Sequence, residues 1–228
     1  MLPLANIFQP LIDVANSVLT FFHDDVGVGW GMAIILLTIV TRIAILPLSI
    51  KQIRSMRSLQ AHQPEIKKIQ ERYKDDRQRM QREMMAFYQE NKINPFASCV
   101  PLLLQLPVFL ALFSLLRSNE FKEELNAPGS NPDFFGIPLD EKAVGAALII
   151  LLVLYFVTMV GSTSIMAASA EGNQRLLMYA LPVFFTPLII NFPAGLVIYW
   201  SWNNLLSIAQ QWLIMRRTSL ARPGLART

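Results

Sequence analysis

The sequence has few charged residues for its length and a single cysteine. Only 16% of its 228 residues are charged and 53% are hydrophobic, whereas a soluble globular domain carries about 25% charge. Cys99 has no second cysteine with which to form an internal disulfide, so the fold cannot depend on oxidation. This composition excludes a disordered chain, a collagen and a disulfide scaffold, and it predicts an integral membrane protein.

Motifs of membrane enzymes are also missing. The two histidines, His23 and His62, lie outside every apolar stretch, so a Ser–His pair at membrane depth is excluded. The sequence has no HExxH motif, no cysteine cluster, no paired intramembrane carboxylates and no glycine-rich phosphate loop. We therefore expect a protein without covalent chemistry, metal or cofactor.

Apolar stretches are the main positive feature. At a helical rise of about 1.5 Å per residue, about 20 residues cross the hydrocarbon core. We predict an all-α membrane protein with five transmembrane helices, in the ranges 29–50, 95–116, 143–166, 176–190 and 194–215. The fourth range is short and contains Pro182 and Pro187.

Residues 1–25 differ from these spans, because apolar residues recur there at intervals of three or four among polar ones. This pattern predicts an extracytoplasmic amphipathic helix on the membrane surface, with a packed core helix as the alternative. The segment has no basic start and no small-residue cleavage site, which is unlike a signal peptide. The lack of a transit peptide favours a bacterial cell (inner) membrane.

The distribution of lysine and arginine predicts the orientation. Sixteen lie in the segments 51–94, 167–175 and 216–228, three in 117–142 and none in 1–25. The positive-inside rule therefore places the N-terminus outside and the C-terminus in the cytoplasm. The segment 117–142 becomes an extracytoplasmic loop, 167–175 a cytoplasmic loop and 216–228 a cytoplasmic tail.

The basic segment 51–94 is expected to form a cytoplasmic helical hairpin. Apolar residues follow a helical period on both sides of Lys74-Asp75-Asp76, and Asp76 can cap the second helix. Its eleven basic residues fit either a solvated face or contact with anionic lipid headgroups or ribosomal RNA. No motif for binding a specific nucleic acid is present.

Arg42 is the most informative single residue, because it lies well inside the first span. An arginine at that depth costs at least about 2.5 kcal/mol. The cytoplasmic surface is about 12 Å away by helical rise, which is too far for snorkelling unless the bilayer is locally thin. No Asp or Glu occurs in any span, and Thr38 lies one turn earlier on the same side. We therefore predict that Arg42 faces a hydrated cavity, with water or a passing substrate as its counter-charge.

Further polar residues lie in the other spans. The fifth span carries Trp200, Asn204, Ser207 and Gln211 on one helical side, with Asn203 and Gln210 beside them. Gln105 in the second span, and Thr158, Ser162 and Thr163 in the third, add to this set. Helix–helix hydrogen bonds would explain these residues as well as a cavity would. Together with Arg42 they favour a shared polar cavity.

Three segments carry a family resemblance. TRIAILPLSIKQ, KINPFASCVPLLLQLPVFLAL and FPAGLVIYWSWNNLLSIAQQWLI occur in order, and with the basic segment the resemblance covers almost the whole chain. The chain thereby resembles the YidC-type membrane protein insertases. The resemblance implies five helices around a hydrophilic groove open to the cytoplasm and to lipid, with Arg42, Thr38, Gln105 and Trp200 lining it. The sequence departs from the family at 161–163, where relatives often place a glutamine.

The resemblance also implies a function. The expected activity is that of a membrane protein insertase and chaperone without a cofactor, with a substrate-binding set of Arg42, Thr38, Gln105, Thr163, Trp200 and Asn204. The expected partners are nascent membrane proteins with hydrophobic segments, the lipid bilayer, the ribosome and the Sec translocon. An assembly chaperone differs only in degree. The alternative is a small membrane transporter with Arg42 as an anion site, although inverted repeats are absent and a pore has no need of the large basic hairpin.

Overall fold

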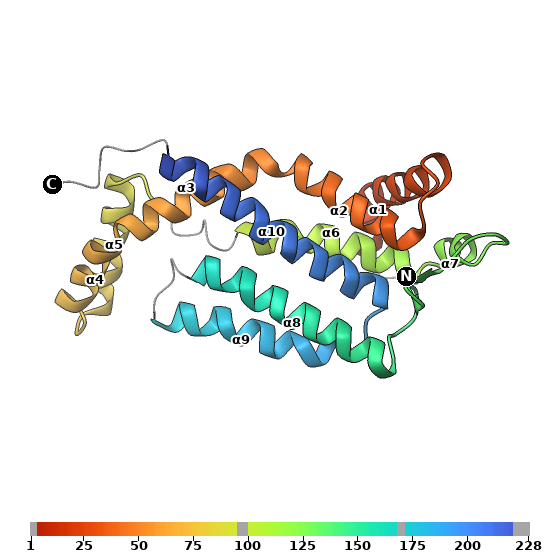
Figure 1. Ribbon diagram of the computed structural model, residues 1–228. Helices are drawn as coiled ribbons and strands as arrows, with labels where there is room; N and C mark the ends of the chain where they lie inside the picture. Colours follow the sequence, from red (N-terminus) through yellow and green to blue (C-terminus); the bar gives the residue numbers. More distant parts are fainter. Residues whose placement is uncertain (1–3, 95–99, 168–171, 221–228) are drawn as a thin grey trace.

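The computed structural model describes residues 4–94, 100–167 and 172–220. Its body is a bundle of long helices that run side by side (Figure 1): α2 (Trp30–Ala44), α6 (Val100–Arg117), α8 (Gly145–Ala167), α9 (Gly172–Ile189) and α10 (Ala194–Leu220). α10 packs against α8, α2 and α6, and α9 packs against α8. The prediction of an all-α protein is confirmed, and α10 packs against three of the other four long helices.

α8 is the helix whose composition best fits lipid. Within the described residues it alone is long and apolar enough to cross a membrane by itself, with a mean hydropathy of 2.3 over Gly145–Ile165. α2 and α3 (Leu46–Ala61) meet this standard only as a bent pair, and the apolar parts of α6 and α9 are shorter. Most described residues of the five predicted spans are helical. The number of helices that cross the membrane stays a prediction.

The first expected span is not one straight helix. α2 ends at Ala44 and α3 begins at Leu46, with an angle of 63° between them. Pro47 lies in the first turn of α3. Because proline has no N–H, the carbonyl of Ile43 loses its helical donor at this point, which favours a bend. α3 then carries the chain out of the bundle into the basic segment.

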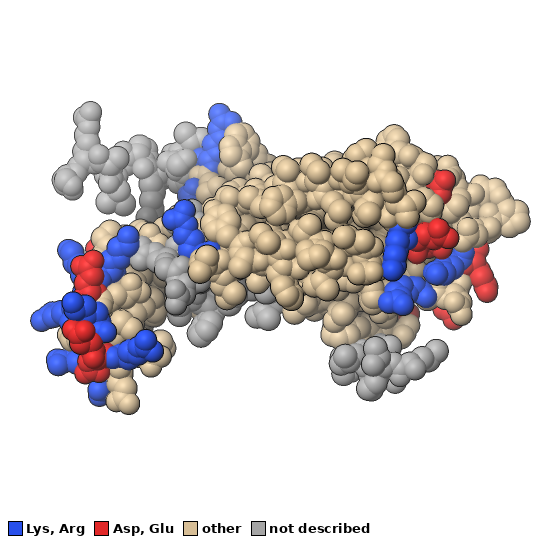
Figure 2. Space-filling view, turned by 90° about the horizontal axis from the view of Figure 1, so that it is seen from below, with Lys and Arg blue, Asp and Glu red and all other residues tan. Residues whose placement is uncertain are grey.

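Charged residues gather at the two ends of the molecule. Figure 2 shows lysine, arginine, aspartate and glutamate at both ends of the face in view, with an uncharged band between them. A band of this kind suits the hydrocarbon layer, where an unpaired charge is costly. The long axis of the bundle is therefore the direction in which it would cross a membrane.

The N-terminal helix α1 (Leu4–Thr20) is amphipathic and lies against α6 and α2. Ala15 and Leu19 are buried, whereas Asp13, Val14 and Ser17 are exposed. A π-helical turn, η1 (Phe21–Asp25), follows and leads into α2. One side of α1 is thus a packed core surface, and the other is exposed.

Trp30 organises the core where α2 begins. Its ring stacks on His23 at 4.1 Å between centroids and meets the edge of Phe121 at 5.0 Å. Its indole Nε1 donates a hydrogen bond of 2.7 Å to the Ser130 hydroxyl. The side chain is only 2% exposed. Its contacts connect α2 with η1, with α7 (Asn119–Leu125) and with the loop that contains Ser130.

A compact cap covers the same end of the bundle. We define the cap as residues 118–142, which include α7 (Asn119–Leu125), β1 (Asp133–Phe134) and β2 (Ile137–Pro138). β1 and β2 form a two-residue antiparallel pair. Gly31 of α2 leaves room for the Phe134 ring, which a side chain there would displace. The Gly195 N–H donates to the Leu139 carbonyl at 2.9 Å, so the cap is also fixed to α10.

Gly195→Ala should therefore destabilise the bundle. The new Cβ would lie 2.9 Å from the Leu139 carbonyl oxygen, a backbone atom that cannot move cheaply. We expect the thermal midpoint in detergent to fall by about 2 to 10 °C, the usual range for overpacking. Gly29→Ala is the matched control, because a Cβ there has open space. Equal midpoints for the two variants would contradict this close packing.

Glu124 in the cap gives a pH-dependent prediction. Desolvation raises the pKa of Glu124, and the nearby Asp24 and Glu120 carboxylates raise it further. Because the folded pKa lies above the unfolded one, ionised Glu124 destabilises the cap at neutral pH. This penalty disappears as the pH falls below the pKa of the unfolded chain.

Glu124→Gln should accordingly raise the thermal midpoint at neutral pH and leave it unchanged in acid. The gain should stay below about 2 °C, since the group is mostly exposed and screened. Midpoints measured across the pH range would check this, with the exposed neighbour Glu123→Gln as control. A gain that persists in acid would show that packing, and not charge, is responsible.

The opposite end carries the basic hairpin, which we define as α4 (Gln63–Arg72) and α5 (Arg77–Glu90). Asp76 caps α5, because its carboxylate accepts a hydrogen bond of 3.0 Å from the Arg79 N–H. A small apolar cluster joins the hairpin to the end of α3, with the members Leu59, Ile66, Met84, Phe87, Tyr88 and Ile93. α5 contains no fully buried residue. Figure 1 shows α4 and α5 beyond the end of the bundle, far from α7.

Candidate functional site

Arg42 forms the centre of a polar network inside the bundle. It lies in the last turn of α2, and its guanidinium reaches across to α10. Nε donates to the Asn203 side-chain oxygen at 2.8 Å, and one terminal nitrogen donates to the Asn203 backbone carbonyl at 3.1 Å. Among the described residues no carboxylate pairs with Arg42. Its charge is therefore held by neutral groups and is not compensated.

The network continues from α10 to α6. The Asn203 amide donates to the Gln105 side-chain oxygen at 2.9 Å, and the Gln105 amide donates to the Tyr199 hydroxyl at 2.7 Å. Asn203 and Tyr199 are 5% and 1% exposed, so this part of the network is closed to solvent. Arg42 itself is only half-buried.

Two of the predicted site residues, Arg42 and Gln105, thus belong to one network. Thr38 does not join it, because its buried hydroxyl donates to the Ile34 carbonyl of its own helix at 2.7 Å. Asn204 turns to the other side of α10, where its amide donates to the Met159 sulfur of α8 at 3.7 Å. Thr163 of α8 is buried as well. The predicted polar set is therefore split between two sides of α10.

Trp200 lies in an aromatic cluster. Its ring is 5.1 Å from Phe109 of α6, 5.5 Å from Tyr155 of α8 and 6.0 Å from Phe185 of α9, measured between centroids. Three helices thus converge on one half-buried indole. Such aromatic contacts stabilise packing by about 0.5–1.5 kcal/mol beyond the buried area, so Trp200 fixes the helices around the polar network.

Sequence reasoning gave too little weight to Asn203 and missed Tyr199. The two residues are four positions apart and lie on the side of α10 that faces α2 and α6. The amides of the fifth span occupy two neighbouring helical sides, and the sequence alone favoured the side of Trp200 and Asn204. Arg42 was the signal that could have identified Asn203. A buried guanidinium needs a hydrogen-bond acceptor, and only one side of α10 faces Arg42.

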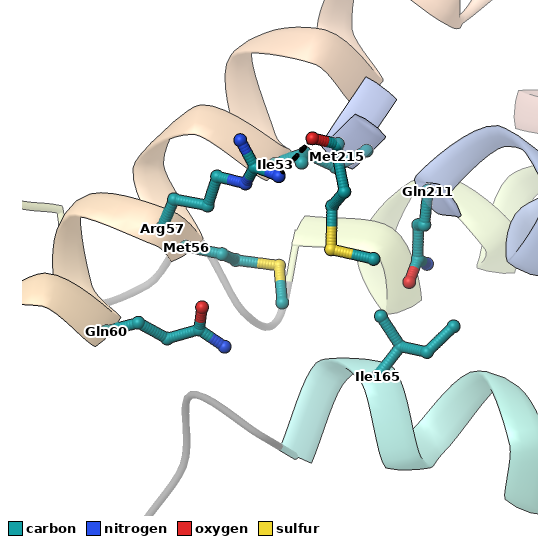
Figure 3. A pocket seen from close by; sticks show the side chains of 7 residues that line it. All are labelled: Ile53, Met56, Arg57, Gln60, Ile165, Gln211 and Met215. Atoms are coloured by element: carbon teal, nitrogen blue, oxygen red, sulfur yellow. Dashed lines mark hydrogen bonds between the residues drawn. The ribbon is translucent and has the colours of Figure 1, made fainter. Parts of the chain in front are cut away.

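A second polar feature lies where α3 leaves the bundle. The Arg57 guanidinium donates to the Met215 carbonyl of α10 at 2.6 Å, which fixes α3 to the end of α10. Below it is a cavity of about 20 Å³, room for a single water. Figure 3 shows its lining from three helices: Ile53, Met56, Arg57, Gln60, Ile165, Gln211 and Met215. The buried side-chain oxygen of Gln211 has no hydrogen-bond partner among the described residues.

Fold and site together define the class of protein. A helical bundle with charged ends and an uncharged middle band is typical of a membrane protein. The family model described as 60Kd inner membrane protein matches residues 21–221. The chain therefore belongs to the 60Kd inner membrane protein family, as the sequence motifs predicted.

Named relatives agree with this assignment. The chain is 41% identical over 200 residues to the membrane protein insertase YidC of Francisella tularensis subsp. novicida (strain U112). The same identity holds for that of subsp. tularensis (strain SCHU S4 / Schu 4). These alignments cover 87% of this chain and 34% of each relative, so the chain spans about a third of their length.

A solved structure shows the same architecture. It is described as an active YidC insertase crystal structure with the first transmembrane domain resolved. The TM-score is 0.66 at 27% sequence identity, and the match covers 90% of this chain and 45% of that one. The described helices therefore have the arrangement of that insertase's corresponding part.

Proposed function

We propose that this protein inserts client membrane proteins into the lipid bilayer and assists their folding. The observation that carries the proposal is the charge of the half-buried Arg42, which Asn203 holds between α2 and α10 with no carboxylate partner among the described residues. Membership of a family whose relatives are named insertases supports the same function.

The physical task is to move a client's polar tail through hydrocarbon, where each charge costs several kcal/mol. A hydrated groove beside Arg42, open to the cytoplasm and to lipid, would shorten the dry path. The guanidinium would attract an acidic tail to it. Burial of the client's apolar segment in lipid, at about 25 cal/mol per Å², would then drive release. Such a cycle needs no covalent step and no cofactor.

The proposed topology has five spans, formed by α2 with the start of α3, then α6, α8, α9 and α10. The cap and the N-terminus lie outside, and the basic hairpin and C-terminus lie in the cytoplasm, in agreement with the sixteen-to-three distribution of lysine and arginine. The tail after Met215 and the loop 167–175 fall wholly or partly outside the described residues. On the cytoplasmic side the basic hairpin would meet anionic lipid headgroups or a ribosome, and a Sec translocon would be a lateral partner.

The alternative function is a small transporter that uses Arg42 as an anion site. The same uncompensated charge favours it, because a free inorganic anion could pair with the guanidinium. Proteoliposomes that contain only this protein would separate the two functions. A single-span client with a short acidic tail should become protease-protected without any energy source, and chloride or phosphate flux should equal that of empty vesicles. Anion flux without client protection would overturn the proposal in favour of transport.

A further inference from the structure

The turn between β1 and β2 contains an unusual residue. Its two central positions are Phe135 and Gly136, with φ angles of +53° and +75°. Positive φ at both positions defines a type I′ turn, for which Asn-Gly or Asp-Gly is the preferred pair. Phenylalanine at the first position is a strained choice, because its Cβ crowds the following carbonyl.

This strained side chain is also almost completely exposed. Phe135 is 91% exposed, the highest value among the large exposed hydrophobic residues of the described chain. Its exposure is not the result of a loose loop, because Phe134 packs into the space left by Gly31 and Leu139 is fully buried. The Phe134 ring also meets the Phe135 ring edge-on at 4.6 Å between centroids. A well-packed hairpin thus holds one aromatic ring outward.

The hairpin belongs to the cap, at the end of the bundle where α8 and α10 begin. The Ala194 N–H donates to the Glu141 carbonyl at 2.7 Å, so the segment after β2 is fixed where α10 begins. Val144, directly before α8, is 76% exposed, and Ile149 and Ile150 on α8 are 63% and 62% exposed. Phe135 is therefore held at the same end of the bundle as the exposed apolar residues at the start of α8.

We propose that Phe135 is a membrane anchor whose ring inserts among the lipids of the leaflet nearest the cap. Strained residues persist where function requires them, and aromatic rings favour the headgroup boundary. Transfer of the ring from water to lipid offsets the strain of the turn. The anchor would fix the depth of the cap and, through Leu139 and Gly195, the depth at which α10 begins. This inference is independent of client insertion.

Photo-crosslinking tests the proposal with the ring retained. p-Benzoylphenylalanine at position 135 should give phospholipid adducts in vesicles of purified protein, detected by mass spectrometry. The matched control is the same residue at Ala127, which is exposed in the same cap and should give none. No lipid adduct at position 135 would overturn the proposal. Protein adducts in native membranes without lipid adducts in vesicles would also overturn it, in favour of a partner protein.

A second measurement avoids the bulky probe. In a C99S background, a nitroxide at Val144→Cys should be shielded from an aqueous nickel chelate in vesicles. Adding F135N should raise its accessibility at least about twofold, although asparagine favours the turn and keeps the hairpin folded. Unchanged accessibility in F135N would mean that Phe135 does not hold the cap at the membrane.

Discussion

Arg42→Ala should reduce the insertion of clients with acidic translocated tails by at least about tenfold, equivalent to about 1.4 kcal/mol of barrier. The substitution removes the charge that α2 holds against α10, together with both hydrogen bonds to Asn203. Clients with uncharged tails should lose much less, because they gain nothing from the guanidinium. The measurement is protease protection of matched clients in proteoliposomes at equal protein levels.

Arg42→Lys should retain much more activity than Arg42→Ala, since a point charge suffices for a mobile partner. Arg54→Ala is the control for general loss of positive charge, because Arg54 is exposed on α3 away from the network. Equal loss in Arg42→Lys and Arg42→Ala would assign Arg42 to the fold. In that case the paired hydrogen bonds to Asn203, which lysine cannot reproduce, would be its role.

Shortening the basic hairpin between Glu65 and Glu90 should lower insertion by about tenfold while the bundle stays folded. The physical reason is recruitment, since a basic surface raises the association rate with anionic partners by 10-fold or more. α5 has no fully buried residue, so its removal exposes little core. Client protection and the thermal midpoint of the bundle would be measured together.

Hydrogen exchange gives an independent check on the hairpin. The small cluster around Ile66 is its main apolar contact with α3, whereas α10 packs against three helices. Amides of α4 and α5 should therefore exchange faster than those of α10. Equally slow exchange would contradict a loosely attached hairpin. A full-length hairpin with Arg77 and Arg82 changed to glutamine would separate loss of positive charge from loss of length.

Composition and periodicity were sufficient to predict the helical class, and the resemblance of three sequence motifs predicted the family. They were insufficient for the bend at Ile45, because a proline near a helix start is also compatible with a straight continuation from the preceding residues. They also could not choose between Asn203 and Asn204. Adjacent residues on a helix point about 100° apart, and the choice depends on how α10 is rotated against α2. That rotation is a result of packing between segments far apart in the sequence.

The cap was the part least accessible to sequence reasoning. Its segment is rich in proline, glycine and asparagine, which predicts a polar loop but not its attachment to the bundle. The contacts that fix it join residues far apart in the sequence, such as Trp30 with Ser130 and Gly195 with Leu139. These contacts depend on the space that Gly31 and Gly195 leave open. A glycine in the sequence does not indicate which distant residue will occupy the space beside it.

The neutral partners of Arg42 have a consequence for the orientation of clients. A carboxylate partner would cancel the charge, but an amide leaves it to act on anything that passes. At an effective dielectric constant of about 20, two like charges 8 Å apart repel by about 2 kcal/mol, which slows passage roughly thirtyfold. For the proposed activity, a client's basic flank would be held back while its acidic or neutral flank crosses. The charge of Arg42 would then select which flank of a client crosses the membrane. Clients would end with their basic flank on the cytoplasmic side, the same charge asymmetry that this chain carries in its own loops.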